Sequence, residues 1–91
     1  MPPEEEFVLT VLEAFQRRFG RLNLGPIDYD VVVRWSQTDM PATIPVRAID
    51  AAADTCSPEK ARRFRVAWLG PDVEEAYAEW RRMIGPYRQG A

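Results

Sequence analysis

The sequence predicts an all-α protein: a compact orthogonal bundle of four to five short helices. Apolar residues recur at steps of three and four, helix start and stop signals divide the chain into segments of helical length, and no convincing pair of strands is present. The 91 residues suffice for one hydrophobic core and are too few for a second. We therefore expect one domain spanning 1–91, with 1–3 and 86–91 loosely ordered.

The first predicted helix runs from about Glu4 to Phe19. Its acidic first turn and the arginines of its last turn, Arg17 and Arg18, complement the helix dipole, and Gly20 is suited to a C-cap. Its apolar stripe is the clearest in the chain. The stripe consists of Phe7, Val8, Val11, Leu12, Phe15 and Phe19.

Two helices joined by a short turn are predicted in the centre of the chain. Asp28 is the expected N-cap of the first, with a hydrophobic staple between Ile27 and Val32. Thr43 is the expected cap of the second, because Pro45 then lies in the first turn, where no N–H is needed. The buried stripe of the second helix is expected to be Ile44, Ala48, Ile49 and Ala52.

The next helix should begin at Ser57, which can cap it, with Pro58 at the first helical position. The run FRVAWL at 64–69 is spaced for a helix but also reads as a short extended segment. Gly70 and Pro71 are expected to end this element.

The last helix is expected to begin at a cap formed by Asp72 and to stop at Gly85 and Pro86. Aromatic side chains should supply most of the buried area of the whole bundle, since large residues at helical spacing are usually core. The expected set is Phe7, Phe15, Trp35, Phe64, Trp68, Tyr77 and Trp80.

Composition argues against several functions. The chain has no histidine, which removes the usual catalytic base and the commonest metal ligand. Cys56 is the only cysteine, so neither an intramolecular disulfide nor a cysteine-based zinc site can form. Ser36 and Ser57 lack an imidazole to activate them, the glycines are scattered singly, and a carboxylate-only magnesium site has no motif behind it. We predict a protein without enzymatic activity, metal or cofactor.

The basic residues form three clusters, and only the middle one is unexplained by helix electrostatics. The first and last clusters fall at predicted helix C-termini, where positive charge is favourable. The middle cluster lies at a helix start, where it is not, so we predict that it binds a partner or phosphate groups. Its members are Lys60, Arg62, Arg63 and Arg65.

The central pair was compared with a DNA-binding helix-turn-helix. Its second helix carries Arg47 alone, followed by Asp50 and Asp54, which would repel phosphates. The net charge of −2 also gives no general attraction to nucleic acid. Any DNA binding is therefore expected to use the cluster at 60–65 on the DNA backbone.

The run from Gly25 to Trp80 contains an acidic cap, Trp35, an MP turn, RAID, and FRVAW leading to GPDVEEAYAEW. With these features it resembles a family of small uncharacterised bacterial helical proteins. The family pattern is L-x-P-x-D, W, G-I-P-L, A-I and V-E-E-A-W, and it implies a helical fold without a known activity. More distantly, the order of helices is similar to helical domains of DnaD-like replication-initiation proteins, which implies protein contacts and weak DNA binding during helicase loading.

We predict a non-enzymatic helical interaction module or accessory subunit with a protein partner. The alternative is an accessory DNA-binding domain of the helicase-loader type that uses the middle basic cluster. A third hypothesis is self-association through the end of the chain from Trp80 to Tyr87, giving a homodimer. With no signal peptide and no apolar run of about 18 residues, a cytoplasmic protein without membrane contact is expected.

Overall fold

The computed structural model describes residues 3–20 and 25–89, and from residue 85 onward it describes the helical backbone alone. The prediction of an all-α bundle is confirmed, since these residues form helices and turns and no strand. The elements are α1 (Pro3–Phe19), α2 (Pro26–Ser36), α3 (Thr43–Thr55), α4 (Pro58–Arg63), the 3₁₀ helix η1 (Val66–Leu69) and α5 (Gly70–Gln89).

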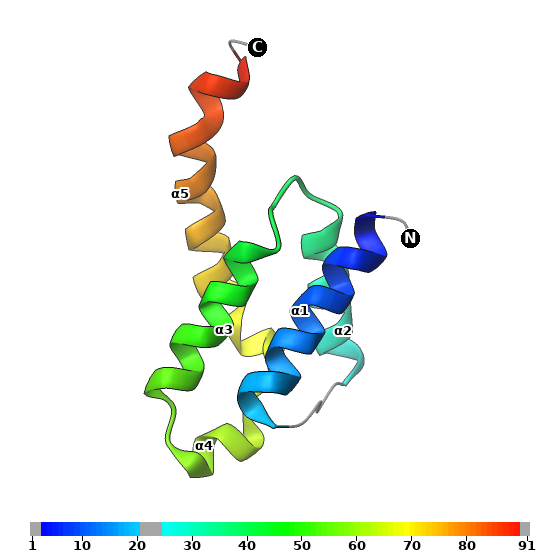
Figure 1. Cartoon of the computed structure of the whole chain (residues 1–91), viewed down its shortest axis with the longest axis vertical. Helices are drawn as coiled ribbons and strands as arrows, with labels where there is room; N and C mark the ends of the chain where they lie inside the picture. The colour runs from blue at the N-terminus through cyan, green and yellow to red at the C-terminus, as the bar shows by residue number, and fades with distance from the viewer. Residues whose placement is uncertain (1–2, 21–24, 90–91) are drawn as a thin grey trace.

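The helices pack around one core, from which α5 projects. α1 lies against α2 and α3, η1 contacts α2, α3 and α5, and α5 packs on α3 (Figure 1). The later half of α5 extends beyond the other helices, while α4 lies at the opposite end of the molecule (Figure 1). The resulting body measures 47 × 29 × 19 Å.

The centre of the core brings together one fully buried aliphatic residue from each of five elements. Every element except α4 therefore has a side chain at the centre. Burial of these apolar side chains stabilises the packing of the five elements against one another. These residues are Val11, Val32, Ile49, Val66 and Val73.

The first helix has the predicted stripe and end. It begins at Pro3, one residue earlier than expected, and Val8, Val11 and Phe15 are buried. Gly20 adopts a positive φ of 75° and donates its N–H to the carbonyl of Gln16 at 2.8 Å, which closes the last turn.

The start of α2 differs from the prediction. The N-cap is Gly25, and Pro26 takes the first helical position, so Asp28 is the third residue of the helix and the prediction that it is the N-cap is wrong. The Asp28 carboxylate instead reaches back and accepts the Gly25 N–H at 2.9 Å, which is the second half of a capping box. The staple predicted from Ile27 is also wrong, because that side chain is 71% exposed.

α3 has the predicted buried stripe but not the predicted cap. Thr43 is its first residue, and Ala42 precedes it without a side-chain hydrogen bond, so the cap assigned to Thr43 is wrong. Pro45 lies in the first turn as expected, and it is buried together with Ile44 and Ile49.

The segment 64–69, for which the sequence allowed a helix or an extended strand-like run, contains both extended and helical backbone. Ser57 caps α4 as predicted, accepting the Lys60 N–H at 3.2 Å. After α4 the chain is extended at Phe64 and Arg65, with ψ of 139° and 144°. It then forms η1, a 3₁₀ helix, rather than continuing α4.

α5 is longer than predicted at both ends. Gly70 and Pro71 begin this helix instead of ending the previous element, because a proline in the first turn has no intrahelical N–H bond to lose. Asp72 therefore lies inside the first turn rather than at the cap. The helix also continues through Gly85 and Pro86 to Gln89, so the predicted stop is wrong; a proline removes one backbone hydrogen bond without requiring the helix to end.

Polar contacts hold the middle of α5 to the α2–α3 connection. The Tyr77 hydroxyl donates to Asp39, and Arg81 donates to that hydroxyl at 3.3 Å. The Arg81 guanidinium also lies 5.7 Å from the centre of the Tyr77 ring, a cation–π contact. Beyond this point Met83 is 68% exposed, so the anchoring of α5 weakens toward its end.

Candidate functional site

The four residues of the predicted basic cluster line one surface depression. Its volume is about 820 Å³, and all four side chains are exposed. We call this depression the cationic pocket; its lining residues are Ser57, Glu59, Lys60, Arg62, Arg63, Arg65 and Trp68.

The local sequence explains why this pocket forms beside α4. Ser57 and Pro58 start a helix that lasts only six residues, and none of its residues is buried. Phe64, directly after the helix, is buried in the core and ties the end of α4 to the bundle. The helix therefore presents basic side chains to solvent on a short but anchored scaffold. Lys60, Arg62 and Arg63 lie in its last turn, where positive charge is favourable, so the prediction that helix electrostatics does not explain these residues is wrong.

A row of aromatic rings connects the core to the pocket. The rings of Phe15 and Phe19 stack with centroids 4.6 Å apart, and those of Phe19 and Phe64 stack at 4.9 Å. Phe64 then meets the Trp68 ring edge-on at 5.2 Å. The row ends at the surface, on one wall of the cationic pocket.

Trp68 was predicted to be a core residue, and that prediction is wrong. Its side chain is 48% exposed, whereas Phe64 is buried. The spacing of four residues would place both rings on one face of an α-helix, but the extended backbone at 64–65 breaks the helical register. Half of an indole ring is thereby available to a ligand.

Arg65 differs from the rest of the cluster because its exposed side chain forms an ion pair with a buried carboxylate. Its guanidinium donates to the carboxylate of Asp28 at 2.9 Å, and the side chain of Asp28 is only 2% exposed. The same carboxylate accepts the Ala67 N–H at 3.1 Å and the N–H of Gly25. Asp28 thus joins the start of α2 to η1, and Arg65 helps to position the wall that carries Trp68.

These hydrogen bonds determine the charge state of Asp28. Burial alone would raise the pKa of this carboxyl. The N–H groups of Gly25 and Ala67 and the guanidinium of Arg65 favour the charged form more strongly, so the pKa of Asp28 lies below its ordinary value of 3.8. The ion pair is therefore intact at neutral pH.

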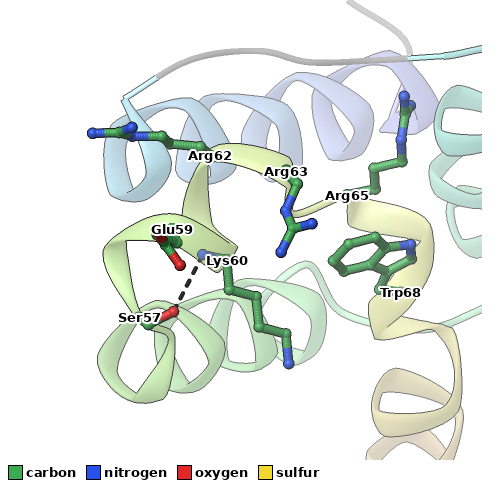
Figure 2. A pocket seen from close by; sticks show the side chains of 7 residues that line it. All are labelled: Ser57, Glu59, Lys60, Arg62, Arg63, Arg65 and Trp68. Atoms are coloured by element: carbon green, nitrogen blue, oxygen red, sulfur yellow. Dashed lines mark hydrogen bonds between the residues drawn. The ribbon is translucent and has the colours of Figure 1, made fainter.

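Three basic side chains of the pocket have no ion pair within the described residues: Lys60, Arg62 and Arg63. Figure 2 shows Lys60 and Arg63 extending into the space beside Trp68, whereas Arg62 points away from it. Arg65 is also turned away from that space (Figure 2). The structure therefore brings two of the four predicted residues together around the indole ring.

The aspartates of α3 are already paired. Arg18 of α1 donates to Asp50 at 2.8 Å and also to Asp54. The hydrogen bond to Asp54 is the main reason why the pKa of Arg18 is raised. Sequence reasoning treated these aspartates as bare negative charges and missed this link between α1 and α3, since the partners are 32 and 36 residues apart.

The arrangement is suited to binding anions. Among the described residues no three histidine, cysteine, aspartate or glutamate side chains are grouped as a metal site. Within the same residues no helix is long and apolar enough to cross a membrane. Two unpaired cations beside an exposed aromatic ring can bind carboxylates or phosphates together with a flat or apolar group.

Sequence reasoning found the basic residues but missed Asp28 and Trp68 as parts of the site. The dipeptide of Gly25 and Pro26 was a usable signal, since proline at the first helical position implies that Asp28 is third. The exposure of Trp68 had no comparable signal in the sequence.

The chain was compared with protein-family models, with curated proteins and with solved structures, and none of them matches. The resemblance to small bacterial helical proteins and to DnaD-like domains therefore stays a prediction that rests on the sequence pattern. The geometry of the cationic pocket supplies the remaining argument about function.

Proposed function

We propose that the protein is a non-enzymatic interaction module that binds an acidic segment of a protein partner at the cationic pocket. The observation that carries this proposal is that Lys60 and Arg63 lie beside the half-exposed residue Trp68 and form no ion pair with the described residues. Cations that have no ion-pair partner among the described residues can exchange water for carboxylates without first breaking such a pair.

The rest of the surface favours a local contact over general adhesion to polyanions. The chain as a whole carries a net charge of −2. Long-range attraction of nucleic acid is therefore weak, whereas a short segment needs only the pocket. These charges support a protein partner.

The test uses a fluorescently labelled, alanine-based peptide with glutamates along one helical face. Fluorescence anisotropy measures the binding of this peptide to the protein. We expect binding at about 50 mM salt that weakens at about 200 mM, because the contact is between exposed charges. The double variant Lys60→Glu/Arg63→Glu should lose this binding. A peptide that fails to bind at low salt, or binds the double variant equally well, would refute the proposal.

A matched control reverses two other exposed cations. Arg47 lies on α3 and Arg82 on the projecting part of α5, and neither lines the pocket. The variant Arg47→Glu/Arg82→Glu has the same net charge as the test variant. It should retain peptide binding, which separates a local site from the effect of overall charge.

A second candidate is an accessory DNA-binding domain of the helicase-loader type. The observation that favours it is the exposed indole of Trp68, on which an unpaired base can stack while Lys60 and Arg63 contact phosphates. Single-stranded DNA should then bind more tightly than duplex DNA, with a steep loss between about 50 and 200 mM salt. Trp68→Ala should abolish the preference for the single strand; no DNA binding at low salt would exclude this candidate.

A further inference from the structure

A second hollow adjoins the cationic pocket, and its lining combines apolar residues with Thr55, Lys60 and Asp72. Its volume is about 450 Å³, and Lys60 and Trp68 line both depressions. Behind them the second hollow is walled by Phe64 and Leu69 and by the alanines of α3. We call these two adjoining depressions, which share Lys60 and Trp68, the groove; most of the apolar lining residues lie in the second depression.

The charges along this groove are opposite at its two ends. Lys60 and Arg63 stand at the cationic end, whereas Asp72 of α5 lines the second hollow. A phosphate backbone that followed the groove would meet this carboxylate, which disfavours a nucleic acid strand. A segment with carboxylates at one end only would meet no such repulsion.

We infer that the groove binds a short acidic segment of a protein partner that also carries one large apolar side chain. Its carboxylates meet Lys60 and Arg63, and its apolar side chain fills the hollow between Trp68 and α3. This inference rests on the proposed function and names the chemistry of the partner. Burial of one anchor residue beside charged contacts is a recurrent way in which grooves recognise peptides.

The test compares two labelled peptides that differ at one position. Both carry the same glutamates on one helical face; one has a leucine beside them and the other has alanine there. Because leucine removes more apolar surface from water than alanine does, the leucine peptide should bind roughly tenfold more tightly than the alanine peptide. Anisotropy titrations of both peptides against the natural chain measure this ratio.

A variant that fills the hollow separates the contribution of the apolar side chain to peptide affinity from the contribution of the charged contacts. Ala51 is exposed and lines the hollow, so Ala51→Leu occupies the space without disturbing the core, and the leucine preference should disappear. Ala53→Leu makes the same change on the same helix outside the hollow and should keep the preference. Circular dichroism of both variants checks that the helical fold is retained.

The possible outcomes distinguish this inference from the proposed function. A leucine preference that is lost only in Ala51→Leu supports both. Equal binding of the two peptides, abolished by Lys60→Glu/Arg63→Glu, overturns the apolar anchor and leaves the proposed function standing. Binding of neither peptide overturns both, and single-stranded DNA that displaces the leucine peptide and binds more tightly would assign the groove to nucleic acid.

Discussion

At the scale of single residues, Asp28 joins three hydrogen-bond donors through one side chain. One buried carboxylate accepts two backbone N–H groups and an arginine, and no buried side-chain polar atom among the described residues lacks a partner. A buried charge is stable only when it is satisfied in this way. Removing it would leave two backbone donors and Arg65 without their acceptor.

We expect Asp28→Asn to lower the free energy of unfolding at pH 7 by about 2 kcal/mol, because an amide cannot accept three donors as a carboxylate does. Urea denaturation measures this loss. Asp30→Asn, an exposed position on the same helix, is the control and should change stability little. An unchanged midpoint for the Asp28 variant would contradict the role given to this carboxylate.

The lowered pKa of Asp28 also predicts how stability depends on pH. The pKa of the Asp28 carboxyl is lower in the folded state than in the unfolded state. At acid pH the unfolded state therefore binds more protons than the folded state does. The stabilisation is complete above the unfolded pKa and is lost as pH falls through the folded pKa. Between about pH 5 and pH 2, the natural chain should therefore lose more stability than Asp28→Asn in parallel denaturation curves.

The same residue shows how far sequence reasoning reaches at this scale. The sequence correctly places this acidic residue in the first turn of a helix, and Pro26 is the signal that identifies it as the third helical residue rather than the N-cap. The contacts of Asp28 with Arg65 and Ala67 span 37 and 39 residues. Contacts over such distances depend on packing, which residue spacing alone does not determine.

At the scale of elements, repeated apolar periodicity predicted the position of helices correctly, whereas isolated boundary residues did not predict where helices begin and end. α1 has both its stripe and its glycine C-cap where expected, because many residues agree. A glycine–proline pair is ambiguous: after a helix it reads as a stop, but Gly70 and Pro71 begin α5. Which of these applies depends on whether the chain beyond can bury a face, as it does at Val73.

Two glycines allow the same substitution to be tested with opposite expected signs. Gly20 has a φ of 75°, where a side chain is strained, so Gly20→Ala should destabilise the protein by about 1 kcal/mol. Gly70 has a helical φ of −47° and open space around it, so Gly70→Ala should stabilise it by about 0.5 kcal/mol. Urea midpoints that move in the same direction for both variants would contradict these backbone assignments.

At the scale of the whole molecule, α5 is anchored at its start and projects at its end. Val73 is fully buried, Tyr77 contacts Asp39, and Met83 is exposed. The fold class followed from the sequence, but this uneven anchoring did not. The apolar stripe of α5 continues past the point where the bundle ends, so periodicity predicts an equally buried face along its whole length.

Val73→Ala should lower the free energy of unfolding by about 2 kcal/mol, whereas Met83→Ala should change it by less than about 0.5 kcal/mol. The difference between these two losses of unfolding free energy shows how far along α5 the side chains contribute to the stability of the bundle. Denaturation at two protein concentrations completes the test. If Met83→Ala destabilises the protein only at the higher concentration, Met83 is buried between copies, as the hypothesis of self-association requires.

The carboxylate of Asp28 has a further consequence for the order in which the chain folds. Its bond to Gly25 is local and can form as soon as the first turn of α2 forms. Its bonds to Arg65 and Ala67 require the closure of a loop that contains α3 and α4, which costs chain entropy before it brings any contact. One side chain thus takes part in an early and a late event of folding, and the wall of the cationic pocket is completed only in the second.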